Sequence, residues 1–271
     1  MKDEIFELIQ KSIINLDNDE LKELYNYWNS NEEKRNHIDF KEFKDLKGWI
    51  RNKGIISKNQ FSTDNAVAHG IDLPYWFNHQ NPENRIMIIG IDPLRSKKEF
   101  IDIKNDVIIG TPYAVHSEKF RKGRTKEYWN FISSLKEQNV VYLTDVFKLY
   151  FIDEEKKTRS YNYLFENYRK ENLSILRKEI EILNPTIIIT LGKLSFELLT
   201  GKKLKSIVDN VNNTIHIDEE FNSIPIIPLV HLSGAVRKSQ KLKFLEMNEI
   251  SNNESIGKSY ASLVKDFLKI K

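Results

Sequence analysis

Two acids, a histidine and a serine stand just after apolar runs of this 271-residue sequence. Asp92 follows the stretch IMIIGI, and Asp145 follows VVYLT. His231 and Ser233 come after the stretch IPIIPLV. Carboxylate and imidazole groups can move protons and stabilise charge that develops during a reaction. An acid before a proline can also form a turn, so Asp92 is either a reactive group or a turn residue.

Four apolar, β-branched runs would position these side chains. They span Ile86–Ile91, Val140–Val146, Thr186–Leu191 and Ile224–Val230. Amphipathic helical patterns such as Tyr163–Leu183 separate them, which favours a parallel sheet covered by helices. We therefore predict a three-layer α/β/α fold with a central, mostly parallel four-stranded sheet. Ligands bind beyond the carboxyl ends of such strands, so the acids and the histidine are expected at one edge.

The N-terminal third has a different pattern. Apolar residues recur at helical spacing in residues 1–60, and residues 61–84 are predicted to be irregular. We predict an N-terminal helical extension over residues 1–80 and an α/β domain over residues 81–271.

The composition excludes several kinds of site. The chain has no cysteine, which excludes disulfides, thiolate metal sites and a cysteine nucleophile. The remaining histidines show no partner pattern, so we expect neither a metal nor a cofactor. No apolar run approaches the roughly 18–20 residues of a membrane span. The N-terminus is acidic and amphipathic, unlike a signal peptide, and we expect a soluble, cytoplasmic protein without membrane contact.

Five motifs occur in a recognisable order. They are GIDP at 90–93, GTPYAV at 110–115, VVYLTDV at 140–146, LNPTIIITLGK at 183–193 and VHLSGAVRKS at 230–239. Together they resemble the uracil-DNA glycosylase superfamily, over residues 85–271. The resemblance implies an enzyme that flips a pyrimidine out of DNA and hydrolyses its N-glycosidic bond, leaving an abasic site.

The resemblance also implies a role for each matched residue. Asp92 would orient or deprotonate the attacking water, and His231 would donate a hydrogen bond to O2 of the leaving base. The backbone N–H around Ile91 would assist, and the flipped base would stack on Tyr113. The loop after the histidine would supply the wedge and contacts to DNA, from Ser233, Ala235, Val236, Arg237 and Lys238.

Two positions depart from the pattern of uracil-specific members. Leu94 stands where those enzymes carry a tyrosine that excludes C5 substituents, and Arg95 and Ser96 could hydrogen-bond a polar substituent on C5. Asp145 stands where many of them carry an asparagine that reads uracil. A carboxylate accepts a hydrogen bond from the N4 amino group of cytosine instead.

Both departures favour a cytosine enlarged at C5. Hydroxymethylated or glucosylated cytosine of phage DNA would fit, with a function in antiviral defence. Asp145 has other interpretations: it could cap a following helix, pair with Lys148, or lie one residue off this alignment.

Two basic clusters are candidates for phosphate contacts, which would make binding strongly salt-dependent. One comprises Lys119, Arg121, Lys122, Arg124 and Lys126, and the other Arg237, Lys238, Lys241 and Lys243. Both could instead be solvated surface.

Three other functions stay open. The chain could be a repair glycosylase for uracil or a damaged base, or an inactive module that binds DNA or a nucleotide. It could also be a lyase in which a lysine such as Lys148 attacks the sugar.

Overall fold

The computed structural model has an α/β fold whose helices and strands fall into two compact units. The residues described are 1–14, 16–29, 66–78, 80, 82–93, 108–153, 158–159, 168–208, 211, 216–218, 223–252 and 255–269. The first unit consists of Met1–Leu73, Asp92–Lys119 and Asp145–Leu183. The second unit consists of Pro74–Ile91, Phe120–Thr144 and Asn184–Lys271.

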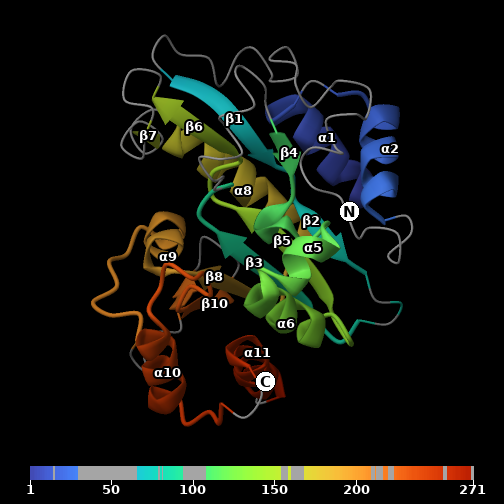
Figure 1. Cartoon of the computed structure of the whole chain (residues 1–271). Helices are drawn as coiled ribbons and strands as arrows, with labels where there is room; N and C mark the ends of the chain where they lie inside the picture. Colours follow the sequence, from blue (N-terminus) through green and yellow to red (C-terminus); the bar gives the residue numbers. More distant parts are fainter. Residues whose placement is uncertain are drawn as a thin grey trace. The chain divides into compact units, whose positions relative to one another are not determined.

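A six-stranded sheet forms the core of the second unit (Figure 1). In spatial order its strands are β2 (Tyr75–Phe77), β5 (Val140–Asp145), β3 (Arg85–Gly90), β8 (Ile187–Leu191), β10 (Ile224–Leu229) and β9 (His216–Asp218). β3 and β10 both pair in parallel with β8, whereas β2 and β9 are antiparallel edge strands. The four predicted strands are confirmed, and two short edge strands extend the predicted four-stranded sheet to six.

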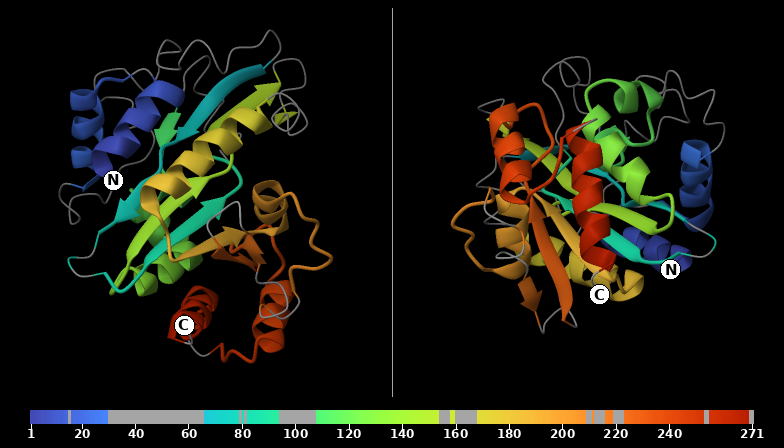
Figure 2. Two further views of the ribbon diagram at one scale, coloured as in Figure 1. Left: turned by 180° about the vertical axis from the view of Figure 1, so that it is seen from behind. Right: turned by 90° about the horizontal axis from the view of Figure 1, so that it is seen from below.

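The central strands are apolar on both faces, as expected for strands covered by helices. Every residue of β5, β8 and β10 is buried, and β3 is buried except at its first residue. Among the described residues, four helices lie entirely within this unit: α6 (Lys126–Leu135), α9 (Lys193–Thr200), α10 (Lys238–Met247) and α11 (Ile256–Lys269). In the right-hand view of Figure 2, α9 and α11 lie on opposite sides of β10.

α6 and α11 pack closely against each other. Gly257 lies at the contact, where a β-carbon would overlap the backbone carbonyl oxygen of Glu127. The Glu127 carboxylate accepts a hydrogen bond of 2.7 Å from the Gly257 N–H. This acidic side chain therefore caps the first turn of α11, where helix N–H groups lack partners within the helix.

The first unit contains a second sheet that the sequence did not predict. Its strand order is β4 (Ile108–Gly110), β1 (Ala66–Asp72), β6 (Leu149–Asp153) and β7 (Thr158–Arg159). β1 is parallel to β4 and antiparallel to β6. The expectation of irregular structure over residues 61–84 was therefore wrong for β1 and β2, whose pairing depends on partners distant in sequence.

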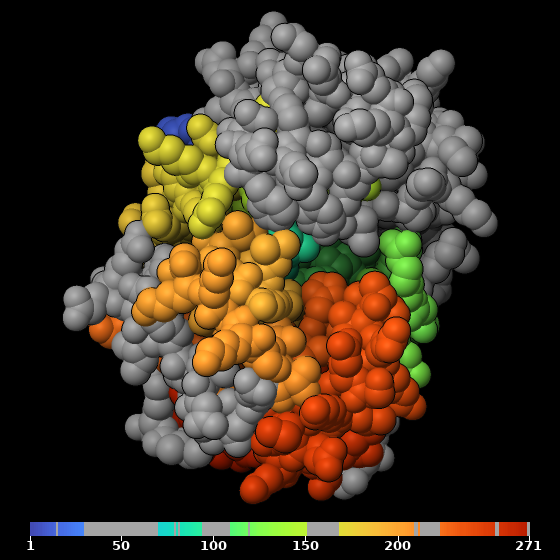
Figure 3. All heavy atoms as spheres, turned by 90° about the vertical axis from the view of Figure 1, so that its left-hand side faces the viewer, coloured from blue at the N-terminus to red at the C-terminus, as the bar shows by residue number. Residues whose placement is uncertain are grey.

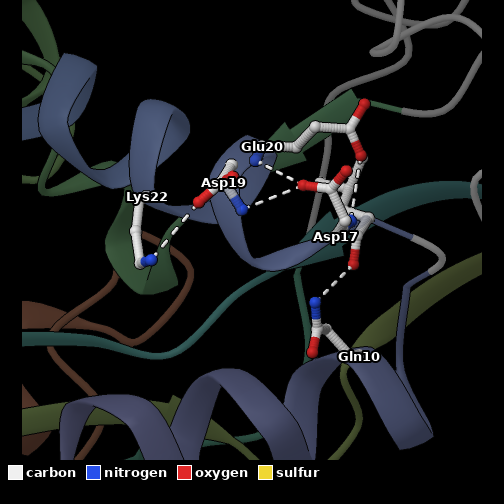
Figure 4. Close-up of polar contacts among 6 residues, drawn as sticks. Gln10, Asp17, Asp19, Glu20 and Lys22 are labelled. Carbon is white, nitrogen blue, oxygen red and sulfur yellow. Dashed lines mark hydrogen bonds and ion pairs between the residues drawn. The ribbon is translucent and has the colours of Figure 1, made fainter.

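The helical prediction is confirmed at the N-terminus by α1 (Lys2–Ser12) and α2 (Asn18–Asn29). Asp17 caps α2: its carboxylate accepts from the N–H groups of Asp19 and Glu20, and the Glu20 carboxylate accepts from the Asp17 N–H (Figure 4). Such reciprocal capping satisfies amides that the helix leaves unpaired. Residues 30–60, also predicted helical, and residues 61–65, predicted irregular, lie outside the described residues, and the division at residue 80 stays a prediction.

Candidate active site

The candidate residues belong to both units, and each unit is described by itself. The first unit contains Asp92, Tyr113 and Asp145, and the second contains Ile91, His231 and the loop Leu232–Lys238.

Asp92 lies two residues beyond β3, and its side chain is only 8% exposed. A buried carboxylate loses most of its hydration, which is costly unless other polar groups compensate. Asp92 is therefore more enclosed than an ordinary turn-forming acid, while Ile91 before it is half-buried. Three further predicted residues lie outside the described residues, so their roles stay predictions: Leu94, Arg95 and Ser96.

Tyr113 stands in an unusual backbone conformation. It has φ 58°, and Ala114 after it has φ 51°, in the left-handed region that side chains disfavour. Hydrogen bonds hold the loop in this shape, from the Ala114 N–H to the Thr111 carbonyl at 2.8 Å and from the Ser117 N–H to the Ala114 carbonyl at 3.0 Å. Each such residue costs about 1–3 kcal/mol, and strain of this kind concentrates at functional sites. The half-buried Tyr113 ring is thus presented by a specifically built loop.

A buried histidine supports this loop from within the same unit. The Nδ1 of His116 lies 2.9 Å from the Thr111 hydroxyl, which also accepts from the His116 backbone N–H at 3.3 Å. The His116 ring packs on Trp28 of α2, with ring centroids 5.6 Å apart. An N-terminal helix therefore contributes to the loop that carries Tyr113.

Asp145 ends β5 with a side chain only 2% exposed. The ammonium of Lys148 fixes the backbone here, because it donates to the Asp145 carbonyl oxygen at 2.7 Å. The same ammonium pairs with the Glu179 carboxylate of α8 (Arg169–Leu183) at 2.6 Å, and both side chains are almost fully buried. The amide oxygen of Asn172, also on α8, accepts from the Lys148 N–H at 3.1 Å.

Two alternatives for Asp145 can be compared with this geometry. A bend, Val146–Lys148, and then strand β6 follow β5, so Asp145 does not cap a following helix. The Lys148 ammonium donates to the backbone carbonyl oxygen of Asp145 at 2.7 Å and to the Glu179 carboxylate at 2.6 Å, and a pairing with the Asp145 carboxylate stays a prediction.

His231 follows β10 in the second unit and is half-buried. The Tyr128 hydroxyl of α6 lies 2.9 Å from its Nδ1 and 3.2 Å from its Nε2. If Tyr128 donates to Nδ1, the ring proton is on Nε2. Gly192, directly after β8, lies against the same ring and has φ 101°, a conformation that favours glycine.

The electrostatic environment keeps His231 uncharged. Burial lowers the pKa of the imidazole to about 4, with a further contribution from the positive charge of Lys241. At neutral pH the ring therefore has one N–H to donate and one nitrogen to accept.

The loop after His231 forms a turn in which the Val236 N–H donates to the Ser233 carbonyl at 3.2 Å. Ala235 is exposed, as are Arg237 and Lys238 at the start of α10. Figure 3 shows this segment and α10 at the molecular surface, in red-orange. The predicted wedge and two of the predicted cationic contacts are thus accessible in this unit.

Two residues of the basic clusters are not solvated cations, so their interpretation as phosphate contacts was wrong. Lys241 is only 6% exposed, and its ammonium donates to the carbonyl oxygens of Leu232 at 3.0 Å and Ser233 at 2.6 Å. Arg121 is 7% exposed, and its guanidinium lies 4.0 Å from the ring centre of Trp129. Lys122, Arg124, Lys126 and Lys243 are exposed, and the Lys119 side chain lies outside the described part.

The structure adds residues that the sequence did not single out, namely Tyr128, Glu179, Trp28 and the buried position of Lys241. Each lies within a helix and outside the five motifs or their strand ends, so its residue type alone does not indicate a function. Among the described residues, no cluster of three or more histidines and acids could hold a metal ion. No helix in the described ranges is long and apolar enough to cross a bilayer.

Comparisons with known proteins agree with the fold and the motifs. A search of the curated proteins finds no significant match to the chain. The family model of the uracil DNA glycosylase superfamily matches residues 77–253. This range contains all five motifs and most of the second unit, and the chain belongs to the uracil-DNA glycosylase superfamily.

Proposed function

We propose that the chain is a monofunctional DNA glycosylase that flips out a C5-modified cytosine and hydrolyses its N-glycosidic bond. Membership of the superfamily supports the general activity. A base inside a duplex is out of reach, so the target nucleotide must leave the stack. The biological setting we propose is defence against phages whose cytosines are hydroxymethylated or glucosylated.

In this proposal Asp92 acts on the sugar side of the reaction. Its carboxylate orients the attacking water and accepts its proton as the water oxygen bonds to C1′. The bond from C1′ to the base nitrogen breaks, and its electron pair leaves with the base. The burial of Asp92 supports this function, because a carboxylate removed from water stabilises a cationic sugar more strongly.

His231 acts on the base side. Its imidazole ring is neutral at pH 7, so it carries one N–H group. This N–H donates a hydrogen bond to O2 of the leaving base, where negative charge develops. The backbone N–H of Ile91 assists, and Tyr113 stacks on the flipped base. The pre-shaped loop around Tyr113 supports this stacking function, since the ring position is fixed before the base arrives.

The observation that carries the choice of cytosine is the buried carboxylate of Asp145 at the end of β5. A carboxylate there accepts from the exocyclic amino group of cytosine and has no amide to donate to O4 of uracil. The backbone of Asp145 is held by Lys148, which supports a fixed reading geometry. Leu94, Arg95 and Ser96 are proposed to receive the C5 substituent.

The geometry of Lys148 supports hydrolysis rather than lyase chemistry. A lysine that attacks the sugar must be deprotonated and accessible. Lys148 is fully buried and ion-paired with Glu179 at 2.6 Å. We propose instead that water is the nucleophile and that Arg237 and Lys238 contact phosphates.

The test is base release from matched DNAs that contain cytosine, 5-hydroxymethylcytosine, its glucosylated form, uracil or thymine. Mass spectrometry would identify each freed base. We expect release of a modified cytosine, lost in Asp92→Ala and strongly reduced in Asp145→Asn. Release of uracil alone, undiminished in Asp145→Asn, would replace the cytosine proposal with uracil repair. Binding without release of any base would leave a DNA-binding module.

A further inference from the structure

Lys241 is a buried cation within the candidate site, and its ammonium bonds to backbone carbonyl oxygens. It lies one turn into α10, and its side chain is 6% exposed. Its ammonium reaches the carbonyl oxygens of Leu232 at 3.0 Å and Ser233 at 2.6 Å. These are the two residues directly after His231, and charge-assisted bonds of this length are among the stronger hydrogen bonds.

One of these carbonyls also closes the loop turn. The Ser233 oxygen accepts from the Val236 N–H at 3.2 Å as well as from Lys241. The Ser233 N–H in turn lies 3.4 Å from the Nδ1 of His231. The Lys241 ammonium therefore bonds to the segment that joins the two ends of the loop. One end is His231, and the other is the turn at Val236, where the wedge is predicted.

We propose that Lys241 is a positioning residue that clamps the loop from His231 to Val236, so that the imidazole and the wedge are held in one fixed arrangement. This proposal rests on the proposed function of His231. It gives Lys241 a role different from that of its exposed neighbours on α10, Lys238 and Lys243, which face solvent.

The charges around His231 agree with this role. Burial is the main cause of its lowered pKa, and the positive charge of Lys241 is the second. Burial lowers the pKa of Lys241 itself, and the Glu127 carboxylate of α6 acts in the opposite direction. Among the described residues, the titratable groups that face this pair are thus Glu127 and Tyr128, both from α6.

The experiment compares Lys241→Met with Lys243→Met in the full chain. Both variants remove one lysine from α10, but Lys243 is exposed. Histidine side chains labelled with ¹³C are titrated by NMR, and the His231 signal is assigned by its loss in His231→Gln. We expect the His231 midpoint, near 4 in the unchanged protein, to rise by roughly one pH unit or more in Lys241→Met. It should not move in Lys243→Met.

A second measurement reports on the loop directly. Amide hydrogen exchange of Val236 should accelerate at least about tenfold in Lys241→Met, because the turn loses its anchor. The amides of β10 and of α11 serve as internal references and should keep their exchange rates. A His231 midpoint and a Val236 exchange rate that are both unchanged in Lys241→Met would overturn the clamp.

These readouts separate the clamp from the proposed activity. Both are made on DNA-free protein, so they decide the role of Lys241 even if no DNA releases a base. Where base release is observed, single-turnover rates add a further test. Lys241→Met should lower the rate of base release, and its acid limb should move to higher pH. An unchanged acid limb in an active Lys241→Met variant would overturn the proposal.

Discussion

Two buried lysines hold the backbone after two strand ends, one in each unit, and they do so differently. Lys148 donates to the Asp145 carbonyl and is neutralised by the Glu179 carboxylate at 2.6 Å. Lys241 donates to the Leu232 and Ser233 carbonyls, and no carboxylate lies within 4 Å of its ammonium in the described part of the chain. The charge of Lys148 is therefore balanced by a carboxylate and has a structural role. The charge of Lys241 instead contributes to the lowered pKa of His231.

The largest expected effect comes from breaking the neutralised pair. Glu179→Gln removes the carboxylate that pairs with the buried Lys148 ammonium at 2.6 Å, and we expect a loss of about 3–5 kcal/mol in the free energy of unfolding. Urea denaturation at pH 7, followed by circular dichroism, measures it.

The control replaces both charges together. Lys148→Met with Glu179→Leu removes both charges of the pair, so the double variant should recover most of the loss. If Glu179→Gln unfolds at the same urea concentration as the unchanged protein, Lys148 does not depend on its carboxylate, and the contrast with Lys241 fails.

The second effect is a pH dependence of stability that belongs to the His231 side. The folded pKa of about 4 lies below the ordinary value of 6.5, so between these values the unfolded chain binds a proton that the native protein does not. Stability should therefore rise with pH through this window and level off above it. The contribution of His231 alone is about 3 kcal/mol at most.

This contribution is isolated by subtraction. The difference in unfolding free energy between the unchanged protein and His231→Gln should grow from pH 4 to pH 6.5, while groups common to both cancel. A difference that is flat over this range would mean that His231 is not desolvated in the native state.

The sequence predicts much of the frame that holds both lysines. Continuous runs of Ile and Val gave the four central strands, because strands buried on both faces need no polar alternation. Strand β2 and strand β1 were missed, since a three-residue edge and a stretch with Gly70 carry little local preference. Their pairing is set by β5 and β6, which lie far along the chain.

The candidate site residues that the sequence predicts are those that lie in the motifs. Asp92, Tyr113, Asp145 and His231 are candidates because of their positions after strands and in motifs. The residues that support them could not be predicted in this way. A lysine in a charged segment is expected to be solvated, whether the fold later buries it or not. Glu179 is 31 residues from Lys148, and only the folded chain shows that the two side chains meet.

The third effect compares the lysines directly. Lys241→Met should cost about 1–2 kcal/mol, because two carbonyl oxygens lose a donor but no charge is left uncompensated. Lys148→Met should cost more, since it removes the ammonium that pairs with the buried Glu179 carboxylate at 2.6 Å. Urea unfolding of the two single variants under one condition gives the ranking. A larger loss of stability in Lys241→Met than in Lys148→Met would contradict this difference between the two lysines.

The smallest expected effect concerns the second contact of His231, the Tyr128 hydroxyl. It tests whether the imidazole is oriented by Lys241 alone or also by Tyr128. Tyr128→Phe removes the hydroxyl that lies 2.9 Å from Nδ1, and we expect a loss of about 0.5–1.5 kcal/mol. Tyr260 is the matched control: its hydroxyl is buried, and it has no hydrogen-bond partner among the described residues. Burial raises the pKa of Tyr260, which agrees with a hydroxyl in apolar surroundings.

Tyr260→Phe should therefore be neutral or slightly stabilising, because it removes a polar group that the fold does not satisfy. The same two variants can be followed by NMR at His231. Only Tyr128→Phe should change the chemical shift of its Nδ1, since only that hydroxyl bonds to the ring. If both variants lose equal stability, the Tyr128 hydroxyl contributes no specific bond. The orientation of the imidazole would then depend on the Lys241 clamp and on packing against Gly192.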